Sequence, residues 1–188
     1  MLKSLVLKNR SYRRFREDHP VTEDDLKSFI DVARLTPSAM NRQPLRYITV
    51  VSTEAREKLF PLLRWAGYLK DWPGPDAGER PAAYIIMLAD HIGKYTICDA
   101  GIAAQTILLS AVEQGLGGCI LGSVDRDKLR QAFSLSSALD ILLVLALGKP
   151  GEKVIIERMH QDIKYWRDEE QVHHVPKYDL AEVIIASF

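Results

Sequence analysis

The sequence contains little cysteine and no excess of either charge. Its 188 residues include two cysteines, Cys98 and Cys119. They form no C-x-x-C pair, so they predict free thiols in a reducing compartment rather than a disulfide framework. Lys plus Arg total 25, as do Asp plus Glu, and the formal net charge is zero. Because nucleic-acid affinity depends on many cations that release counterions, this balance argues against a nucleic-acid partner.

Long hydrophobic runs are missing as well. The longest apolar stretches, residues 141–147 and 102–112, are shorter than the ~20 residues of a membrane helix. Residues 1–8 have neither the apolar length nor the cleavage site of a secretory signal. With 47 % hydrophobic and 27 % charged residues, the composition is that of a folded domain. We therefore expect no membrane partner and a cytoplasmic location.

Several motifs with well-defined chemistry are also absent. No G-x-G-x-x-G follows a predicted strand, and there is no G-x-x-x-x-G-K-[ST], H-E-x-x-H or G-x-S-x-G. His173 and His174 are adjacent, so an extended chain directs them to opposite faces. The sequence therefore predicts no metal site, no Walker-type site and no serine nucleophile.

Helical and strand-like segments alternate along the first 150 residues. Apolar spacing and capping residues predict helices at 22–36, 53–63, 97–116 and 125–133, and strands at 47–51, 82–89, 119–122 and 141–147. The strand at 82–89 is apolar throughout, which is typical of a strand covered on both faces. These segments predict one domain built from both helices and strands.

The segment 8–16 carries five cationic side chains and is the strongest functional signal. Arg10 and Arg13 flank Ser11, and the guanidinium fork matches the geometry of phosphate. These residues predict a binding site for one phosphate group. The alternative is a solvated basic run at the start of a helix.

A second polar segment, residues 37–44, joins a predicted helix to a predicted strand. Ser38, Asn41 and Gln43 supply donors and acceptors, and the small residues beside them leave room for a flat ligand. This pattern suits the edge of a heterocycle or a polyol chain. The alternative is a helix end whose polar side chains satisfy only local backbone groups.

Two further segments are less specific. Trp65, Tyr68 and Trp72 lie in a loop rich in proline and glycine, where they either stack on a planar acceptor or anchor the loop to the core. Residues 151–188 are apolar but irregular, and we expect this extension of the 1–150 core to cover a partner subunit. The whole chain, 1–188, is then a single domain.

Four segments in order resemble the FMN-dependent nitroreductase family. They are Arg10-Ser11-Tyr12-Arg13-Arg14-Phe15, residues 37–44, the glycine-rich passage into Cys119-Ile120-Leu121-Gly122-Ser123, and Gly148-Lys149-Pro150. The resemblance implies an α+β fold with a mostly antiparallel central sheet of four strands flanked by helices. It also implies a homodimer with FMN at the interface and a C-terminal extension that wraps the partner.

The resemblance also implies roles for individual residues. Those matching the family's contacts to the FMN phosphate and ribityl chain are Arg10, Ser11 and Arg13. Those matching a loop that meets the flavin from the other subunit are Pro37, Ser38, Ala39, Asn41 and Gln43. Leu121 and Gly122 match backbone donors at flavin N5, and Lys149 or alternatively Lys164 is a further basic group around the phosphate.

The activity implied by the resemblance is a two-step, ping-pong transfer of electrons. NAD(P)H gives hydride to FMN, and an electron-poor acceptor (a nitroaromatic, quinone, enone or flavin) then takes the electrons. Because the reactive atom belongs to the cofactor, no catalytic residue is expected. The alternatives are a non-catalytic protein that binds or stores FMN, and an interaction module that binds phosphate without flavin.

Overall fold

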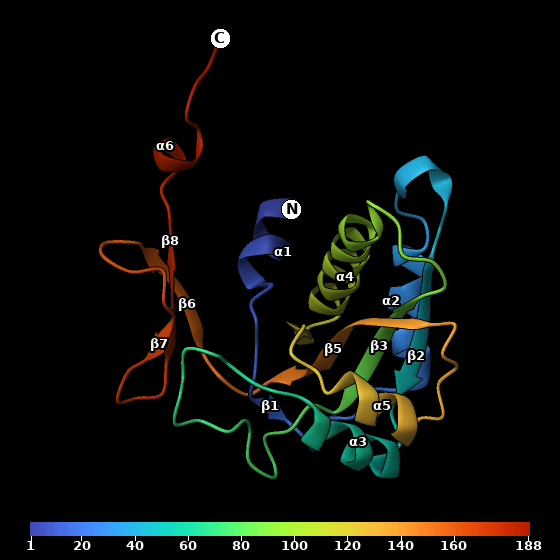
Figure 1. Cartoon of the computed structure of the whole chain (residues 1–188). Helices are drawn as coiled ribbons and strands as arrows, with labels where there is room; N and C mark the ends of the chain where they lie inside the picture. The colour runs from blue at the N-terminus through green and yellow to red at the C-terminus, as the bar shows by residue number, and fades with distance from the viewer.

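The computed structural model describes residues 1–188 and is built around a five-stranded antiparallel sheet (Figure 1). Its strands are β1 Phe15–Arg16, β2 Leu45–Val50, β3 Ala83–Ala89, β4 Gly117–Leu121 and β5 Asp140–Pro150. β5 pairs with β4 and with β3, and β3 pairs with β2. The four predicted strands are confirmed. The additional strand β1 is short and pairs with the end of β5, where Phe15 lies opposite Pro150.

Helices cover both faces of this sheet, as predicted for an α+β fold. Side chains of α2 (Glu23–Ala33) and α4 (Thr96–Glu113) pack in one buried cluster, and side chains of α3 (Thr53–Leu59) and α5 (Arg126–Ala132) pack in a second. Every residue of β3 is buried, and its side chains alternate between the two clusters. Its uniformly apolar sequence therefore reflects cover on both faces.

The helices begin where the capping residues predict. Thr22 Oγ1 accepts a hydrogen bond from the backbone N of Asp25 at 3.1 Å, and Asp25 Oδ2 accepts one from the backbone N of Thr22 at 2.8 Å. This reciprocal cap starts α2. α4 is long and apolar enough to cross a membrane by length and composition, but half of that window is buried inside the domain. Its buried alanines allow it to lie close to α2 and the sheet.

An N-terminal helix, α1 (Leu2–Lys8), was not predicted from the sequence. None of its residues is buried, and its seven residues are too few for apolar spacing to identify a helix. Leu2 and Leu7 are exposed to solvent. The helix leads directly into the basic segment and sets the position from which Arg10 projects.

The secondary structure of the C-terminal extension was not predicted from the sequence. Residues 151–188 contain a separate three-stranded sheet in the order β6–β8–β7, followed by the short helix α6. Their bounds are β6 Val154–Arg158, β7 Trp166–Arg167, β8 His173–Lys177 and α6 Leu180–Val183. The parallel pair β6–β8 joins residues 19 apart, a non-local pairing that local apolar spacing does not indicate. Figure 1 shows this sheet to one side of the core, with the C-terminus pointing away.

Candidate functional site

The basic N-terminal segment and the tail sheet enclose a cavity of about 290 Å³. Arg10, Ser11 and Arg13, the residues predicted to hold a phosphate, all line it. The remaining lining residues are Asn9, Tyr165, His173, Val175 and Lys177. We call this space the N-terminal cavity.

Arg13 is the best-fixed cation of the N-terminal cavity, with only 9 % of its surface exposed. Its Nη1 donates to the carbonyl O of Ser11 at 3.2 Å and lies 3.2 Å from Nε2 of His173. Its guanidinium carbon is 4.7 Å from the centre of the Tyr165 ring. Because arginine only donates, His173 Nε2 is the acceptor, and the imidazole is neutral with its proton on Nδ1. Burial, reinforced by the charge of Arg13, lowers the pKa of His173 to about 4.

Three nitrogen atoms of residues that line the N-terminal cavity are buried without a hydrogen-bond partner. They are Nε of Arg10, Nε of Arg13 and Nδ1 of His173. Buried donors are normally paired, and three donors around one cavity suit an anion that accepts several hydrogen bonds. Arg10 itself is anchored, because its Nη2 donates to the carbonyl O of Val6 at 2.6 Å. These residues fit a phosphate group.

A buried ion pair between Glu152 and Arg167 holds the backbone of the basic segment in place. The carboxylate of Glu152 accepts hydrogen bonds from the backbone N of Arg13 and, at 3.1 Å, from that of Arg14. Its other oxygen pairs with Arg167 Nη2 at 3.0 Å, and the two side chains are 2 % and 8 % exposed. Burial lowers the pKa of Arg167, and the charge of Glu152 opposes that shift. Sequence reasoning did not identify Glu152.

The aromatic residues of the loop between α3 and β3 act as anchors. Trp72 lies under two guanidinium groups, 4.2 Å from that of Arg167 and 5.7 Å from that of Arg14. Trp65 is buried in the second core cluster, and the Tyr68 ring packs 4.9 Å from Tyr165. These contacts favour the anchoring interpretation over stacking on an acceptor.

The two glycines at the start of β4 let the basic segment lie along the sheet. Ser11 forms a parallel bridge to Gly118, and the backbone N of Tyr12 donates to the carbonyl O of Gly118 at 3.1 Å. A Cβ atom on Gly117 would lie 2.6 Å from the Tyr12 ring. A side chain at Gly117 would therefore displace the basic segment at Tyr12.

Leu121 is the last residue of β4, and Gly122 follows it directly. Arg126 holds this end, because its Nη2 donates to the carbonyl O of Gly122 at 3.2 Å and its Nε to that of Ile141 at 2.9 Å. A Cβ atom on Gly122 would meet only Leu143, at 3.8 Å. The backbone at Gly122 is therefore held in place and open to a ligand.

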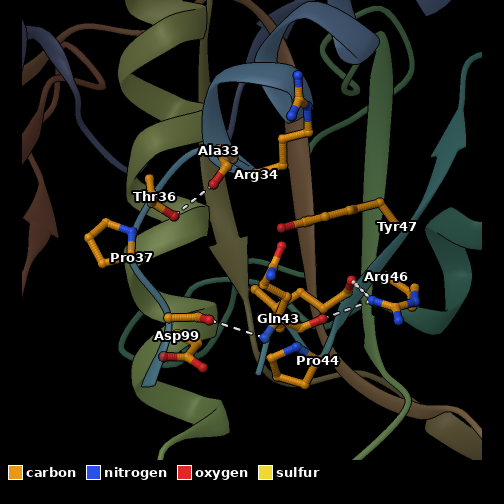
Figure 2. A pocket seen from close by; sticks show the side chains of 11 residues that line it. Ala33, Arg34, Thr36, Pro37, Gln43, Pro44, Arg46, Tyr47 and Asp99 are labelled. Carbon is orange, nitrogen blue, oxygen red and sulfur yellow. Dashed lines mark hydrogen bonds between the residues drawn. The ribbon is translucent and has the colours of Figure 1, made fainter. Parts of the chain in front are cut away.

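The loop 37–44 lines a separate hollow of about 170 Å³ between α2 and β2 (Figure 2). Ser38 Oγ accepts from the backbone N of Gln43 at 3.0 Å, and Asp99 Oδ1 accepts from the backbone N of Ala39 at 3.1 Å. Figure 2 shows Pro37 and Asp99 on one side of this hollow and Gln43 on the other. Ser38 thus satisfies local backbone, as the alternative interpretation expects.

Three residues of the loop 37–44 have strained backbone conformations. Met40, Asn41 and Gln43 have positive φ values of 55°, 53° and 48°. Non-glycine residues adopt this region at an energetic cost, so neighbouring bonds must hold them there. Asp99, 5 % exposed, supplies one such bond from α4. Because it is distant in sequence from the loop, sequence reasoning did not identify it.

The two predicted groups of site residues line separate hollows in one chain. No residue of the loop 37–44 lines the N-terminal cavity. Lys149 Nζ donates to the carbonyl O of Gly115 at 3.0 Å, and exposed Lys164 pairs with Asp162 at 2.8 Å. Neither lysine lines the N-terminal cavity, so their role around a phosphate stays a prediction. The basic tail residue found there is Lys177, which follows His173 and Val175 at the strand period of two.

The pKa of His174, the neighbour of His173, shifts in the opposite direction. Its Nδ1 and Nε2 lie 3.0 Å from carboxylate oxygens of Glu157 and Asp168, and its ring stacks on Trp166 with centroids 4.0 Å apart. Both ring nitrogens can donate only in the imidazolium form. The hydrogen bond to Asp168, supported by Glu157, therefore raises the pKa of His174.

We expect His174→Gln to destabilise the protein more at pH 6 than at pH 9. The charged His174 stabilises the folded state fully below its unfolded pKa of about 6.5, and this contribution is lost as pH rises through the higher folded pKa. Urea unfolding should give a difference from wild type of about 1 kcal/mol at pH 6. Exposed His19→Gln is the control, and a His174→Gln effect that does not change with pH would contradict the assignment.

The chain matches a family model and several known proteins. The model of the Nitroreductase family matches residues 6–149. A protein from Methanothermobacter thermautotrophicus, provisionally named NADH dehydrogenase/NAD(P)H nitroreductase, is 30 % identical over 150 residues, covering 76 % of this chain and 74 % of its own. An FMN reductase [NAD(P)H] from Bacillus subtilis is 24 % identical, covering 95 % and 80 %.

A solved structure supports the fold. A nitroreductase-type protein from Exiguobacterium sibiricum, determined in complex with FMN, superposes with a TM-score of 0.67 at 17 % identity, covering 81 % of this chain and 89 % of its own. The family match spans the core sheet, the basic segment and the loop 37–44. The chain therefore belongs to the nitroreductase family, whose members are FMN-dependent oxidoreductases that use NAD(P)H.

Proposed function

We propose that this chain binds FMN with its phosphate in the N-terminal cavity and uses NAD(P)H to reduce an electron-poor acceptor. The observation that carries the proposal is the set of unpartnered donors on Arg10, Arg13 and His173 around one cavity. Ser11 adds a hydroxyl group and Lys177 a further positive charge. Together they match the needs of a phosphate dianion.

The flavin ring would extend from this cavity along the end of β4. The backbone N–H groups of Leu121 and Gly122 would face N5, in a region kept open at Gly122 and fixed by Arg126. A second subunit would bring Pro37, Ser38, Ala39, Asn41 and Gln43 to the other side of the ring. The separation of the two hollows within one chain supports such a shared site.

The proposed working unit is a homodimer in which residues 151–188 of one single-domain chain cover its partner. The tail and α1 carry exposed apolar side chains that nothing in their own chain covers, including Leu2, Ile163, Leu180 and Ile185. Exposed apolar patches of this kind support burial against another subunit. A monomer with full FMN occupancy would contradict the shared site.

The residues of the chain hold and orient the cofactor and do not act as acid or base. Bound FMN would accept hydride from NAD(P)H and then pass electrons to a nitroaromatic, quinone, enone or flavin in ping-pong fashion. Arg10, Arg13 and Lys177 fix the phosphate end, and the β4 backbone orients the ring. The free thiols of Cys98 and Cys119 support a reducing, cytoplasmic setting for this reaction.

Anaerobic titration of the purified protein tests the proposal. We expect a yellow protein whose flavin absorbance is bleached by NADH or NADPH and restored by an acceptor. A yellow protein that neither nucleotide bleaches would instead support flavin storage. A colourless protein that does not bind added FMN would support a phosphate-anchored interaction module.

A further inference from the structure

A third hollow, of about 180 Å³, lies beside the loop 37–44, between the loop and the start of α4. Arg42 and Met40 line it from the loop, and His91, Lys94 and Tyr95 line it from the segment before α4. We call it the Arg42 hollow. It shares Ala39 with the loop that would contact the flavin, and its basic residues have no role in the FMN site proposed above.

Two cationic side chains, Arg42 and Lys94, line the Arg42 hollow. Arg42 and Lys94 form no ion pair, whereas the nearby Arg46 pairs with Asp90. The Nη1 atom of Arg42 and the Nε2 atom of His91 lie 3.8 and 3.5 Å from the position that a Cβ atom on Gly93 would occupy. The absence of a side chain at Gly93 therefore keeps the space between these two groups open.

The other groups that face the Arg42 hollow do not cancel this charge. Asp99 is the one carboxylate in its wall, and its Oδ1 accepts a hydrogen bond from the backbone N of Ala39. Lys94 Nζ lies 5.2 Å from the centre of the Tyr95 ring, so the lysine is held at the rim by a cation–π contact. The residues that line the hollow thus include a guanidinium group, an ammonium group and an imidazole, which could bind an anion.

We propose that the Arg42 hollow binds a phosphate group of the nicotinamide donor. This inference rests on the proposed function, because it requires the donor to reach the flavin beside the loop 37–44. The expected acceptors are mostly uncharged, whereas the dinucleotide carries phosphates at a distance from its reactive ring. Arg42 presents two donors in the geometry of a phosphate, and Lys94 supplies a point charge.

The test compares Arg42→Ala and Lys94→Ala with wild type, using Lys27→Ala on exposed α2 as the control. The rate of anaerobic bleaching is measured against NADPH and NADH concentration, which separates the dissociation constant from the limiting rate. Each variant should raise the dissociation constant about 10-fold and leave the limiting rate unchanged, since one charge-assisted contact is lost. An effect on NADPH alone assigns the 2′-phosphate, and an equal effect on both nucleotides assigns the pyrophosphate.

Calorimetry with adenosine 2′,5′-bisphosphate and with ADP provides a second readout on the purified holoprotein. We expect wild type to bind at least one of them and both variants to bind it about 10-fold more weakly. Unchanged dissociation constants in both variants would overturn the inference. If NAD(P)H fails to bleach wild type, the proposed function fails, and calorimetry still decides whether the Arg42 hollow binds phosphate.

Discussion

Replacing Glu152 with alanine is expected to lower the free energy of unfolding by about 3–5 kcal/mol, because a buried cation loses its only carboxylate partner. Arg167 would remain 8 % exposed with no anion beside it, and the backbone N–H groups of Arg13 and Arg14 would lose their acceptor. Equilibrium unfolding in urea measures this loss. FMN retention should fall with it, since the proposed phosphate site depends on that backbone.

Further variants, measured in the same way, distinguish the loss of the ion pair from the loss of side-chain packing. Exposed Glu170→Ala is the matched control and should change the free energy of unfolding by less than about 0.5 kcal/mol. The double variant Glu152→Met, Arg167→Met removes both charges and should recover most of the loss. A Glu152→Ala protein as stable as the control would show that the ion pair does not support the segment.

Replacing Arg13 with alanine should weaken FMN binding by about 100-fold, because two charge-assisted hydrogen bonds to phosphate would be lost. Arg13 is the most buried cation of the N-terminal cavity and is held by Ser11, His173 and Tyr165. Arg13→Lys keeps the charge without the planar fork, so it should lose about 10-fold. Quenching of FMN fluorescence on titration with the apoprotein measures both values.

The control for Arg13 lies three residues away in the same basic segment. The exposed Arg16 side chain forms one ion pair, with Asp18 at 3.9 Å, and Arg16→Ala should retain FMN as wild type does. Thermal unfolding of each apoprotein shows whether a loss of FMN reflects a loss of fold. If Arg13→Ala binds FMN as tightly as Arg16→Ala, the phosphate is held elsewhere.

The core sheet could be predicted because its signals are local. The uniformly apolar run at β3, the cap at Thr22 and the glycines that begin β4 each act over a few residues. The pairing of these strands then follows from the short connections between them and from the helices that cover both faces of the sheet. Arg10, Ser11 and Arg13 could be grouped for the same reason, since they are neighbours in sequence and the structure brings them to one cavity.

The rest of the site depends on contacts between distant residues. Glu152 lies 139 residues from Arg13, His173 lies 160 residues away, and Asp99 lies 60 residues from Ala39. Nothing in the local sequence of the tail indicates that its sheet would bring His173 and Lys177 to the N-terminal cavity. A buried glutamate and a neutral histidine acquire their roles only when the chain folds around them.

A crystal structure of the protein with FMN bound tests the central claim most directly. We predict the phosphate between Arg10, Ser11, Arg13 and Lys177, and the flavin ring between the end of β4 and the loop 37–44 of a second subunit. FMN bound with its phosphate outside the N-terminal cavity, or wholly within one chain, would contradict the account.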